Sequence, residues 1–254
     1  MLKPERYLRI MELINDKGIV STEELCKALN VSTATIRRDL VQMDIDKMLM
    51  RTHGGAVALT KTSNADVPIS IRQHLQKGEK ARIGAAAVDL VKEGESIYIG
   101  AGTTTRELAA RLGGFHHLTV LTNDIGVAYE IASNTDNSLI VAGGSLKKSS
   151  VTLVGFFTEQ MLQELHVDMA FMAVDAVDIY AGFVDYSTDE ALIKRTMLKN
   201  SGKCVMLVDH SKFQNHAFMS IFPLSDVDIV ITSDDIDDSF KRHFEAEGIQ
   251  LIFA

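Results

Sequence analysis

The larger, C-terminal part of the chain alternates short apolar segments with amphipathic ones, and this alternation strongly limits its fold. Apolar runs typical of buried strands stand at residues 96–99, 118–121, 138–141, 169–174, 204–208, 227–231 and 249–253. Helical patterns separate most of them, at residues 80–91, 104–112, 125–133, 159–165, 189–200 and 236–247. Because parallel strands need a crossover connection, usually a helix, this order predicts an α/β fold with a mostly parallel, Rossmann-like sheet covered on both faces. Ligands bind such sheets beyond the carboxyl ends of the strands.

The loop after the first of these strands is rich in glycine and threonine. It reads Gly100-Ala101-Gly102-Thr103-Thr104-Thr105 and leads straight into a helical pattern. Glycines let a ligand approach the backbone, hydroxyls donate hydrogen bonds, and the free N–H groups of a helix N-terminus favour an anion. The loop therefore predicts phosphate binding, although a tight turn with threonine caps explains the same residues.

Loops after later strands bring further polar groups to the same edge of the predicted sheet. The candidate ligand-binding residues among them are Asn123, Asp124, Gly143, Gly144, Lys194, Asp209 and Lys212. Lys212 could neutralise an anionic ligand, and Asp209 could accept hydrogen bonds from sugar hydroxyls. Lys194 lies one turn into a predicted helix, where an ordinary solvated lysine is the competing interpretation.

The first sixty residues carry three short helical patterns. The first runs over residues 4–15 and ends at Gly18. The second opens on Ser21-Thr22-Glu23-Glu24, which is a capping-box signature. Ser32 caps the third helix, whose Ile36 and Leu40 share its buried face. This spacing predicts a helix-turn-helix.

The third helix has the chemistry of a helix that reads DNA. A recognition helix places its N-terminal residues against base edges and phosphates in the major groove. Short hydroxyls allow close approach, and arginine offers a planar fork for guanine or phosphate. Residues 49–57 then predict a short hairpin with a glycine turn, which would form a wing. The candidate DNA-binding residues are Ser21, Thr22, Ser32, Thr33, Thr35, Arg37, Arg38, Arg51 and His53.

Simpler interpretations exist for the same residues. Arg37 and Arg38 taken alone fit an ordinary solvated helix face, and His53 beside a glycine turn fits a plain surface histidine. The charge distribution favours DNA. The whole chain carries a net charge of −8. Residues 1–60 hold nine Lys/Arg and eight Asp/Glu, which gives a net charge of +1. The remainder holds 17 Lys/Arg and 26 Asp/Glu, which gives −9, so the acidic residues are concentrated outside the N-terminal segment.

Composition and spacing suggest a cytoplasmic protein of two domains. The expected boundaries are a winged helix-turn-helix over residues 1–58, a linker over residues 59–76, and a larger domain over residues 77–254, to which the resemblance described below assigns effector binding and oligomerisation. No apolar run is long enough to span a membrane, and the N-terminus lacks the apolar core of a signal peptide. The two cysteines, Cys26 and Cys204, lie far apart, which suggests a reducing compartment. No metal, cofactor or catalytic residue is predicted.

These motifs resemble the DeoR family of bacterial transcriptional regulators. The resemblance rests on Val20 to Leu40, which includes Val31-Ser32 and Thr35-Ile36-Arg37-Arg38-Asp39-Leu40, and on Arg51-Thr52-His53-Gly54-Gly55-Ala56. It continues through the Gly-Thr-Thr loop, Thr122-Asn123, Gly143-Gly144 and Asp209 to Phe213. The family usually has aspartate at the position of Gly100 and serine at that of Asp124. Compared with the family, this chain therefore lacks the acid of the first loop and has an acid in the next loop.

The resemblance implies a winged helix-turn-helix and an effector domain like the phosphosugar isomerases and CoA-transferases. It also implies a sequence-specific repressor of carbohydrate metabolism genes that is controlled by a phosphorylated sugar or polyol. We expect a homo-oligomer, dimer or tetramer, bound to double-stranded operator DNA. One alternative is a phosphosugar isomerase-like enzyme with a DNA-binding appendage, in which Asp124 and His210 would supply acid–base groups. Another is a repressor whose effector pocket has degenerated.

Overall fold

The computed structural model of the protein describes residues 2–46, 48–52, 54–57, 69–214 and 217–254. The chain divides into two compact units, Met1–Leu75 and Gln76–Ala254. The segment expected to be a linker, residues 59–76, falls largely outside the described residues. Its described part contains one short helix, α4 (Ile69–Arg72). None of the described helices is both long and apolar enough to cross a bilayer.

The first unit is a winged helix-turn-helix, as predicted. Its helices are α1 (Lys3–Lys17), α2 (Thr22–Leu29) and α3 (Thr33–Ile45). Its strands β1 (Ile19–Ser21), β2 (Met50–Arg51) and β3 (Gly55–Val57) form an antiparallel sheet in the order β1-β3-β2. The predicted hairpin is β2–β3. Strand β1 was not predicted, because three residues are too few to show an alternating pattern.

Local chemistry fixes the ends of the helices in this unit. The Ser21 hydroxyl accepts from the Glu24 N–H at 3.2 Å, and a Glu24 carboxylate oxygen accepts from the Ser21 N–H at 2.8 Å. The Ser32 hydroxyl accepts from the Thr35 N–H at 3.2 Å. Asn30, at the turn between α2 and α3, has a φ of 51°, a conformation that asparagine tolerates. Both predicted caps are thereby confirmed.

The core of the first unit lies between the three helices and β1, and one ion pair stiffens it. Ile10, Leu25 and Leu40 are among its fully buried side chains. Asp39 of α3 is buried and accepts from the Arg6 guanidinium of α1 at 2.5 Å. This pair holds the third helix against the first. It was not predicted, because 33 residues separate the partners.

The second unit is built on a seven-stranded sheet in the order β15-β14-β12-β9-β4-β5-β6, with every neighbouring pair parallel. The strands are β4 (Ser96–Ile99), β5 (Thr119–Thr122), β6 (Ser138–Val141), β9 (Val167–Met172), β12 (Ser201–Leu207), β14 (Ile229–Thr232) and β15 (Gln250–Phe253). All seven strands predicted from the apolar runs are present, with ends that differ by a few residues. The predicted parallel α/β fold is confirmed.

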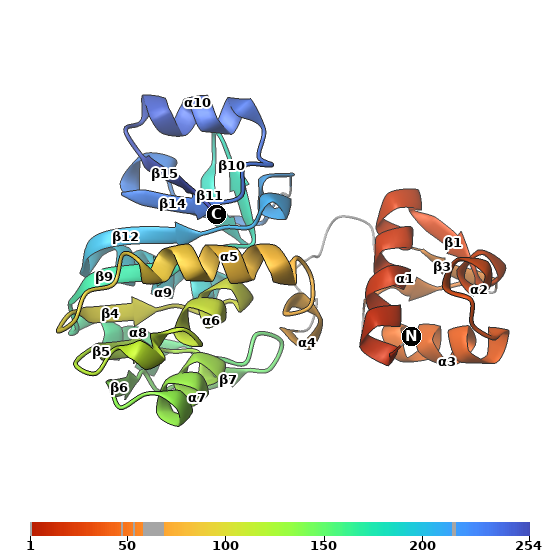
Figure 1. Ribbon diagram of the computed structural model, residues 1–254, viewed down its shortest axis with the longest axis horizontal. Helices are drawn as coiled ribbons and strands as arrows, with labels where there is room; N and C mark the ends of the chain where they lie inside the picture. The colour runs from red at the N-terminus through yellow and green to blue at the C-terminus, as the bar shows by residue number, and fades with distance from the viewer. Residues whose placement is uncertain (1, 47, 53, 58–68, 215–216) are drawn as a thin grey trace. The chain divides into compact units, whose positions relative to one another are not determined.

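Helices cover both faces of this sheet. They are α5 (Lys77–Val88), α6 (Thr103–Ala109), α7 (Ile125–Asn134), α8 (Phe156–Gln163), α9 (Thr188–Lys199) and α10 (Asp238–Ala246). Figure 1 shows α5 lying across the near face and α9 behind the sheet. The core on the α5 side includes Ile83 and Val120, and the core on the other side includes Met197 and Phe244.

Two small antiparallel sheets were missed by the sequence analysis. One is the hairpin of β7 (Ser145–Lys147) and β8 (Thr152–Val154). The other joins β10 (Ala176–Asp178), β11 (Gly182–Asp185) and β13 (Met219–Phe222). These strands have three or four residues each and lack a clear period. Short 3-10 turns at Leu112–Gly114, His210–Gln214 and Leu224–Asp226 complete the unit.

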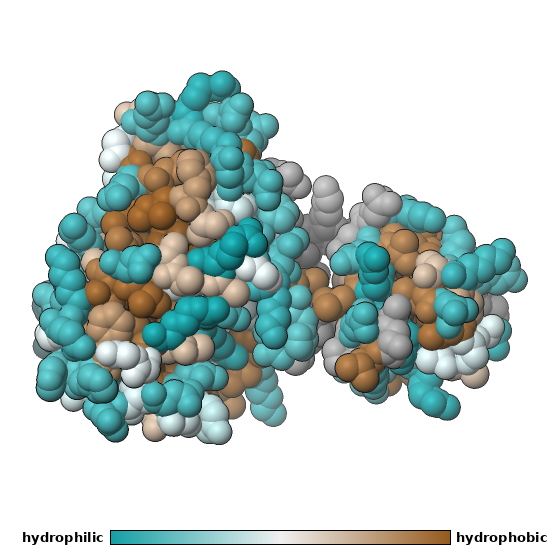
Figure 2. Space-filling model, viewed as in Figure 1, coloured by the Kyte–Doolittle hydropathy of each residue, from teal (hydrophilic) through white to brown (hydrophobic). Residues whose placement is uncertain are grey.

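The surface of the second unit is uneven in polarity. Figure 2 shows apolar side chains gathered over β14 and β15 on the face turned to the viewer, and hydrophilic side chains covering α10. Helix α10 is amphipathic, because Phe240 and Phe244 are turned into the core. Phe253 of β15 stays half-exposed beside the Lys241 ammonium, which lies 5.5 Å from its ring centre.

Candidate DNA-binding surface and effector site

The arginines of α3 are open to solvent. Arg37 and Arg38 are exposed, and neither forms a hydrogen bond or ion pair with another described residue. Asp39, which follows them, turns inward to Arg6. Because that carboxylate is neutralised inside the unit, it does not offset the positive charge that Arg37 and Arg38 present to solvent.

The remaining predicted DNA-binding residues divide into structural and open positions. The hydroxyls of Ser21 and Ser32 serve as helix caps, and the Thr22 N–H donates to the Gly54 carbonyl at 2.8 Å. Thr33 is exposed, whereas Thr35 is half-buried with its hydroxyl 2.9 Å from that of Ser32.

Among the described residues of the wing, Arg51 is an open cation. The Arg51 side chain is exposed on β2, and its backbone N–H donates to the Asp44 carboxylate at 3.1 Å. Gly55 brings β3 close to β1, since a Cβ there would lie 2.1 Å from the Val20 carbonyl oxygen. His53 lies outside the described residues.

In the second unit, hydrogen bonds from Thr105 hold the conformation of the glycine–threonine loop. The Thr105 hydroxyl is buried within hydrogen-bond distance of the Gly100 and Gly102 carbonyls, at 2.7 and 2.9 Å. A Cβ at Gly102 would lie 2.9 Å from the Ala173 Cβ, and one at Gly100 would lie 3.1 Å from the Tyr98 ring. Packing therefore accounts for both glycines.

The threonines of this loop differ in how open they are. Thr104 and Thr105 are buried, whereas Thr103 is half-buried and is the most open of the three. Thr103 and the backbone of the turn consequently form the part of this loop that a ligand can reach most readily.

Asn123, predicted to bind the effector, has both ends of its amide engaged within the fold. Its Oδ1 accepts from the Tyr98 hydroxyl at 2.7 Å, and its Nδ2 donates to the Leu153 carbonyl at 2.9 Å. Asn123 is also buried. The structure therefore gives this side chain a positioning role: it joins β4, the loop after β5, and the hairpin β7–β8.

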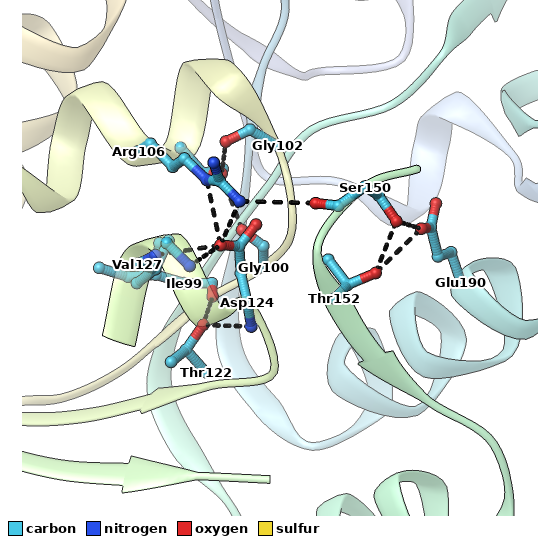
Figure 3. Close-up of polar contacts among 12 residues, drawn as sticks. Ile99, Gly100, Gly102, Arg106, Thr122, Asp124, Val127, Ser150, Thr152 and Glu190 are labelled. Carbon is cyan, nitrogen blue, oxygen red and sulfur yellow. Dashed lines mark hydrogen bonds and ion pairs between the residues drawn. The ribbon is translucent and has the colours of Figure 1, made fainter. Parts of the chain in front are cut away.

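Asp124 is the fully buried N-cap of α7. Its Oδ1 accepts from the N–H groups of Gly126 and Val127, at 2.7 and 3.0 Å, and from Nε and Nη2 of Arg106, at 3.0 and 2.8 Å. Burial raises the pKa of Asp124 above its ordinary value, although Arg106 pulls the pKa the other way. Figure 3 shows the guanidinium lying over the carboxylate.

Arg106 was not singled out by the sequence analysis. It lies on α6, one turn after the glycine–threonine loop, and its backbone N–H donates to the Gly102 carbonyl at 3.2 Å. A Cβ at Gly126 would lie 2.3 Å from the central carbon of its guanidinium, so glycine at that position makes room for the arginine. The unusual acid at Asp124 was the available signal, since a buried carboxylate requires a nearby cation.

The predicted glycines of the third loop are also explained by packing. The Gly143 carbonyl accepts from the Thr158 hydroxyl at 2.8 Å, and a Cβ at Gly144 would lie 2.0 Å from that hydroxyl oxygen. Beyond them, the hairpin β7–β8 folds back onto the loop after β5. Here the Ile125 N–H donates to the Val151 carbonyl at 3.2 Å.

Glu190 of α9 completes the polar cluster in Figure 3 and was also missed. Its Oε1 accepts from the hydroxyls of Ser150 and Thr152, at 2.6 and 3.2 Å, and lies 3.3 Å from the Lys147 ammonium. Burial would raise the pKa of Glu190, but Lys194, Lys147 and the Ser150 hydroxyl outweigh burial and lower it. The anionic form is therefore favoured.

Lys194 is not the solvated lysine that was the competing interpretation. Its side chain is 6% exposed, and its ammonium lies 2.5 Å from an Asp185 oxygen. Burial opposes its charge, yet the carboxylates of Asp185, Glu190 and Asp175 outweigh burial and raise the pKa of Lys194. The ammonium is thus engaged within the fold, and contact with an effector stays a prediction.

The last predicted loop lies after β12. Asp209 is buried and accepts from the Ser211 hydroxyl, and the Lys212 N–H donates to the Asp209 carbonyl at 3.0 Å. The Lys212 side chain is half-buried. His210 is bound to Glu79 of α5 through its backbone N–H and through Nδ1, each at 2.7 Å.

The fold and these two surfaces define a winged helix-turn-helix protein with a parallel α/β domain that has a polar strand-end site. Comparison with known protein families agrees. The DeoR-like helix-turn-helix domain matches residues 6–62, and the DeoR C terminal sensor domain matches residues 75–234. The chain belongs to the DeoR family, and it is a DNA-binding transcriptional regulator with a sensor domain for an effector.

Similar proteins cover the chain almost completely. The HTH-type transcriptional regulator GolR of Listeria innocua is 31% identical, over 98% of each chain. The HTH-type transcriptional regulator GlpR of Haloferax volcanii is 31% identical, over 99% of this chain and 98% of that one. The glycerol-3-phosphate regulon repressor of Escherichia coli is 31% identical, over 91% of each chain. Among solved structures, the ribose 5-phosphate isomerase of Methanocaldococcus jannaschii is 20% identical, with a TM-score of 0.41, over 54% of this chain and 55% of that one.

Proposed function

We propose that this regulator is a repressor whose affinity for operator DNA is set by a phosphorylated sugar or polyol. The observation that carries the DNA half of the proposal is the exposed, uncompensated arginine pair on α3 of a winged helix-turn-helix. Thr33, Arg37 and Arg38 contact the major groove, and Arg51 contacts the flanking backbone. Ser21 and Ser32 contribute through the helix ends that they cap.

The effector half rests on the strand-end site of the second unit. The backbone at Gly100–Thr103 and the half-buried Lys212 bind the phosphate. The buried Asp124 lies in the neighbouring loop, with Asn123 and Lys194 positioning the groups around it. The resemblance to regulators named for glycerol 3-phosphate makes that ester a natural first probe. We expect such a sensor to act in the cytoplasm, where it has access to operator DNA.

A sensor fits the site better than the isomerase-like alternative does. An isomerase needs an acid–base pair free to exchange protons with its substrate. Here Asp124 caps a helix and binds Arg106, while the His210 ring is bound to Glu79. These contacts support binding without turnover.

A thermal-shift and turnover screen of the full chain tests the proposal. The probes are glycerol 3-phosphate, ribose 5-phosphate and fructose 6-phosphate, with inorganic phosphate as the reference. We expect at least one ester to raise the melting temperature of the protein, because a ligand that binds only the native state stabilises it. We expect no chemical change in that ester. Turnover of an ester would favour the enzyme, and melting curves that no phosphate ester moves would favour a degenerated pocket.

A further inference from the structure

The two oxygens of the Asp124 carboxylate are used very unequally. Oδ1 accepts four hydrogen bonds, from the N–H groups of Gly126 and Val127 and from two nitrogens of Arg106. Oδ2 is buried and accepts none from the described part of the chain. Buried polar atoms in native proteins nearly always have a partner, and a charged acceptor without one is especially unfavourable.

The neighbouring hydroxyls are committed elsewhere. Thr152 lies opposite Asp124 in an antiparallel bridge, and Ser150 lies two residues before it. Both hydroxyls lie within hydrogen-bond distance of Glu190 Oε1, at 3.2 and 2.6 Å, and 2.7 Å from each other. Each hydroxyl has a single proton to donate. These contacts therefore leave Oδ2 with no donor from either side chain.

From this geometry we infer that Asp124 Oδ2 is the acceptor for a hydroxyl of the effector. The inference rests on the proposed function and narrows its ligand class. A carboxylate oxygen repels a phosphate or carboxylate and selects a group that donates a hydrogen bond. The effector is therefore a polyol or sugar phosphate that places a free hydroxyl at Asp124 while its phosphate binds at the Gly100–Thr103 turn.

The segment that covers Asp124 must move for this contact to form, because Oδ2 is shielded in the structure. The neighbouring segment is 150–153, whose Thr152 pairs with Asp124 in an antiparallel bridge. It is held by the Leu153 N–H, which donates to the Asn123 carbonyl at 2.8 Å, and by the Val151 carbonyl, which accepts from Ile125 at 3.2 Å. Val151 has a φ of 57°, which is strained for a β-branched residue. We expect displacement of this segment to expose Oδ2 to the ligand.

Asp124→Asn changes the group at the Oδ2 position in a defined way, because the cap dictates how the new amide is oriented. The donors from Gly126, Val127 and Arg106 all require an oxygen at the Oδ1 position, so the amide NH₂ takes the place of Oδ2. The variant thereby turns the open acceptor into a donor. Asp124→Ser is the decisive variant, because a serine hydroxyl retains the helix cap and leaves neither an acceptor nor a donor at the Oδ2 position.

The binding measurement is calorimetric titration of the full chain with esters that differ in their hydroxyls. Glycerol 3-phosphate, ribose 5-phosphate and fructose 6-phosphate are compared with propyl phosphate, which has none. We expect the wild type to bind at least one polyol ester about tenfold more tightly than propyl phosphate. Asp124→Ser should lose this preference, and Asp124→Asn should keep at most part of it, because a hydroxyl can also accept from the amide NH₂. The affinity of both variants for propyl phosphate should stay within about twofold of the wild type.

Each other outcome decides against the inference. If Asp124→Ser keeps the preference for the polyol ester, Asp124 does not bind a hydroxyl of the effector, although the proposed sensor stands. If the wild type binds no phosphate ester, the proposed function and the inference fall together. If the variants do not fold, hydrogen exchange of the wild type decides: the Leu153 amide should exchange faster with a bound polyol ester than with propyl phosphate, and equal rates would refute the inference.

Discussion

At the scale of single residues, charge compensation separates the functional arginines from the structural ones. Arg6 and Arg106 are each paired with a buried aspartate, at 2.5 and 2.8 Å. Arg37 has no such partner among the described residues and stays exposed. A guanidinium that the fold does not use is available for a phosphate or a guanine edge.

We therefore expect Arg37→Ala to weaken operator binding by about tenfold or more, since a good arginine–base contact contributes about 1–3 kcal/mol. Fluorescence anisotropy with a labelled operator duplex measures this change. The control is Arg9→Ala, because Arg9 is exposed on α1 and forms only a surface pair with Glu12. Equal operator affinities for the Arg37 variant and the wild type would remove this residue from the DNA contacts.

The buried Asp185–Lys194 pair leads us to predict how the stability of the fold depends on pH. Burial raises the pKa of Asp185 to about 6, with a further contribution from Asp175, against the pull of Lys194. The ordinary pKa of aspartate is about 3.9, so the folded chain binds this proton more tightly than the unfolded chain does. Protonated Asp185 consequently stabilises the folded chain at low pH. This contribution to the free energy of unfolding is lost as the pH rises from about 4 to about 6.

Asp185→Asn should abolish that dependence. In urea unfolding followed by circular dichroism, the free energy of unfolding of the variant relative to wild type should increase between pH 5 and pH 6, by at most about 1.4 kcal/mol per pH unit. The difference should level off above pH 7. A difference that stays constant across the whole range would show that Asp185 does not titrate there.

At the scale of elements, the sequence was most informative where a pattern spans a whole helix or strand. The seven strands of the parallel sheet are continuous apolar runs because both faces of the sheet are covered. The capping box of α2 is likewise a local pattern. The hairpin β7–β8 carries no such signal, and its polar residues act through Glu190, 40 positions from Ser150. Contacts of that kind arise only from the tertiary fold.

In the loops, too, the sequence predicted local features but not the contacts made between distant residues. The glycine–threonine loop was correctly located at the end of the first strand of the sheet, but its glycines and Thr105 are explained by packing within the fold. Asp124 was recognised as unusual, whereas its partner Arg106 was not, since a lone arginine on an amphipathic helix resembles a solvated one. The sequence therefore predicted where the site lies in the fold, but it did not predict which side chains in the site pair with one another.

The cap of the recognition helix provides a test at this scale. Ser32→Ala removes the acceptor for the Thr35 N–H, so we expect the first unit to lose about 1 kcal/mol of stability. Ser32→Asn should retain most of that stability, because asparagine is an equally good cap. Chemical denaturation followed by amide NMR signals of residues 33–45 reports this unit alone. Equal loss in both variants would mean that capping is not the role of Ser32.

At the scale of the whole molecule, the proposed function requires more than one copy of the chain. A single recognition helix reads few base pairs, and symmetric regulators read two half-sites about 34–36 Å apart or at multiples of that distance. We expect the protein to sediment as a dimer or tetramer, and duplexes selected by it from a random library should contain repeated half-sites. A monomer that selects a single short site would contradict this expectation.

The central claim is that an anionic polyol ester in the sensor domain controls how tightly the helix-turn-helix binds DNA. The most direct measurement is the affinity of the full chain for its selected duplex, with and without a saturating phosphate ester from the thermal-shift screen. Coupling between the two sites predicts a change of about 5–150-fold, which is typical of allosteric proteins. Identical DNA affinities in the presence and absence of every bound ester would contradict the account.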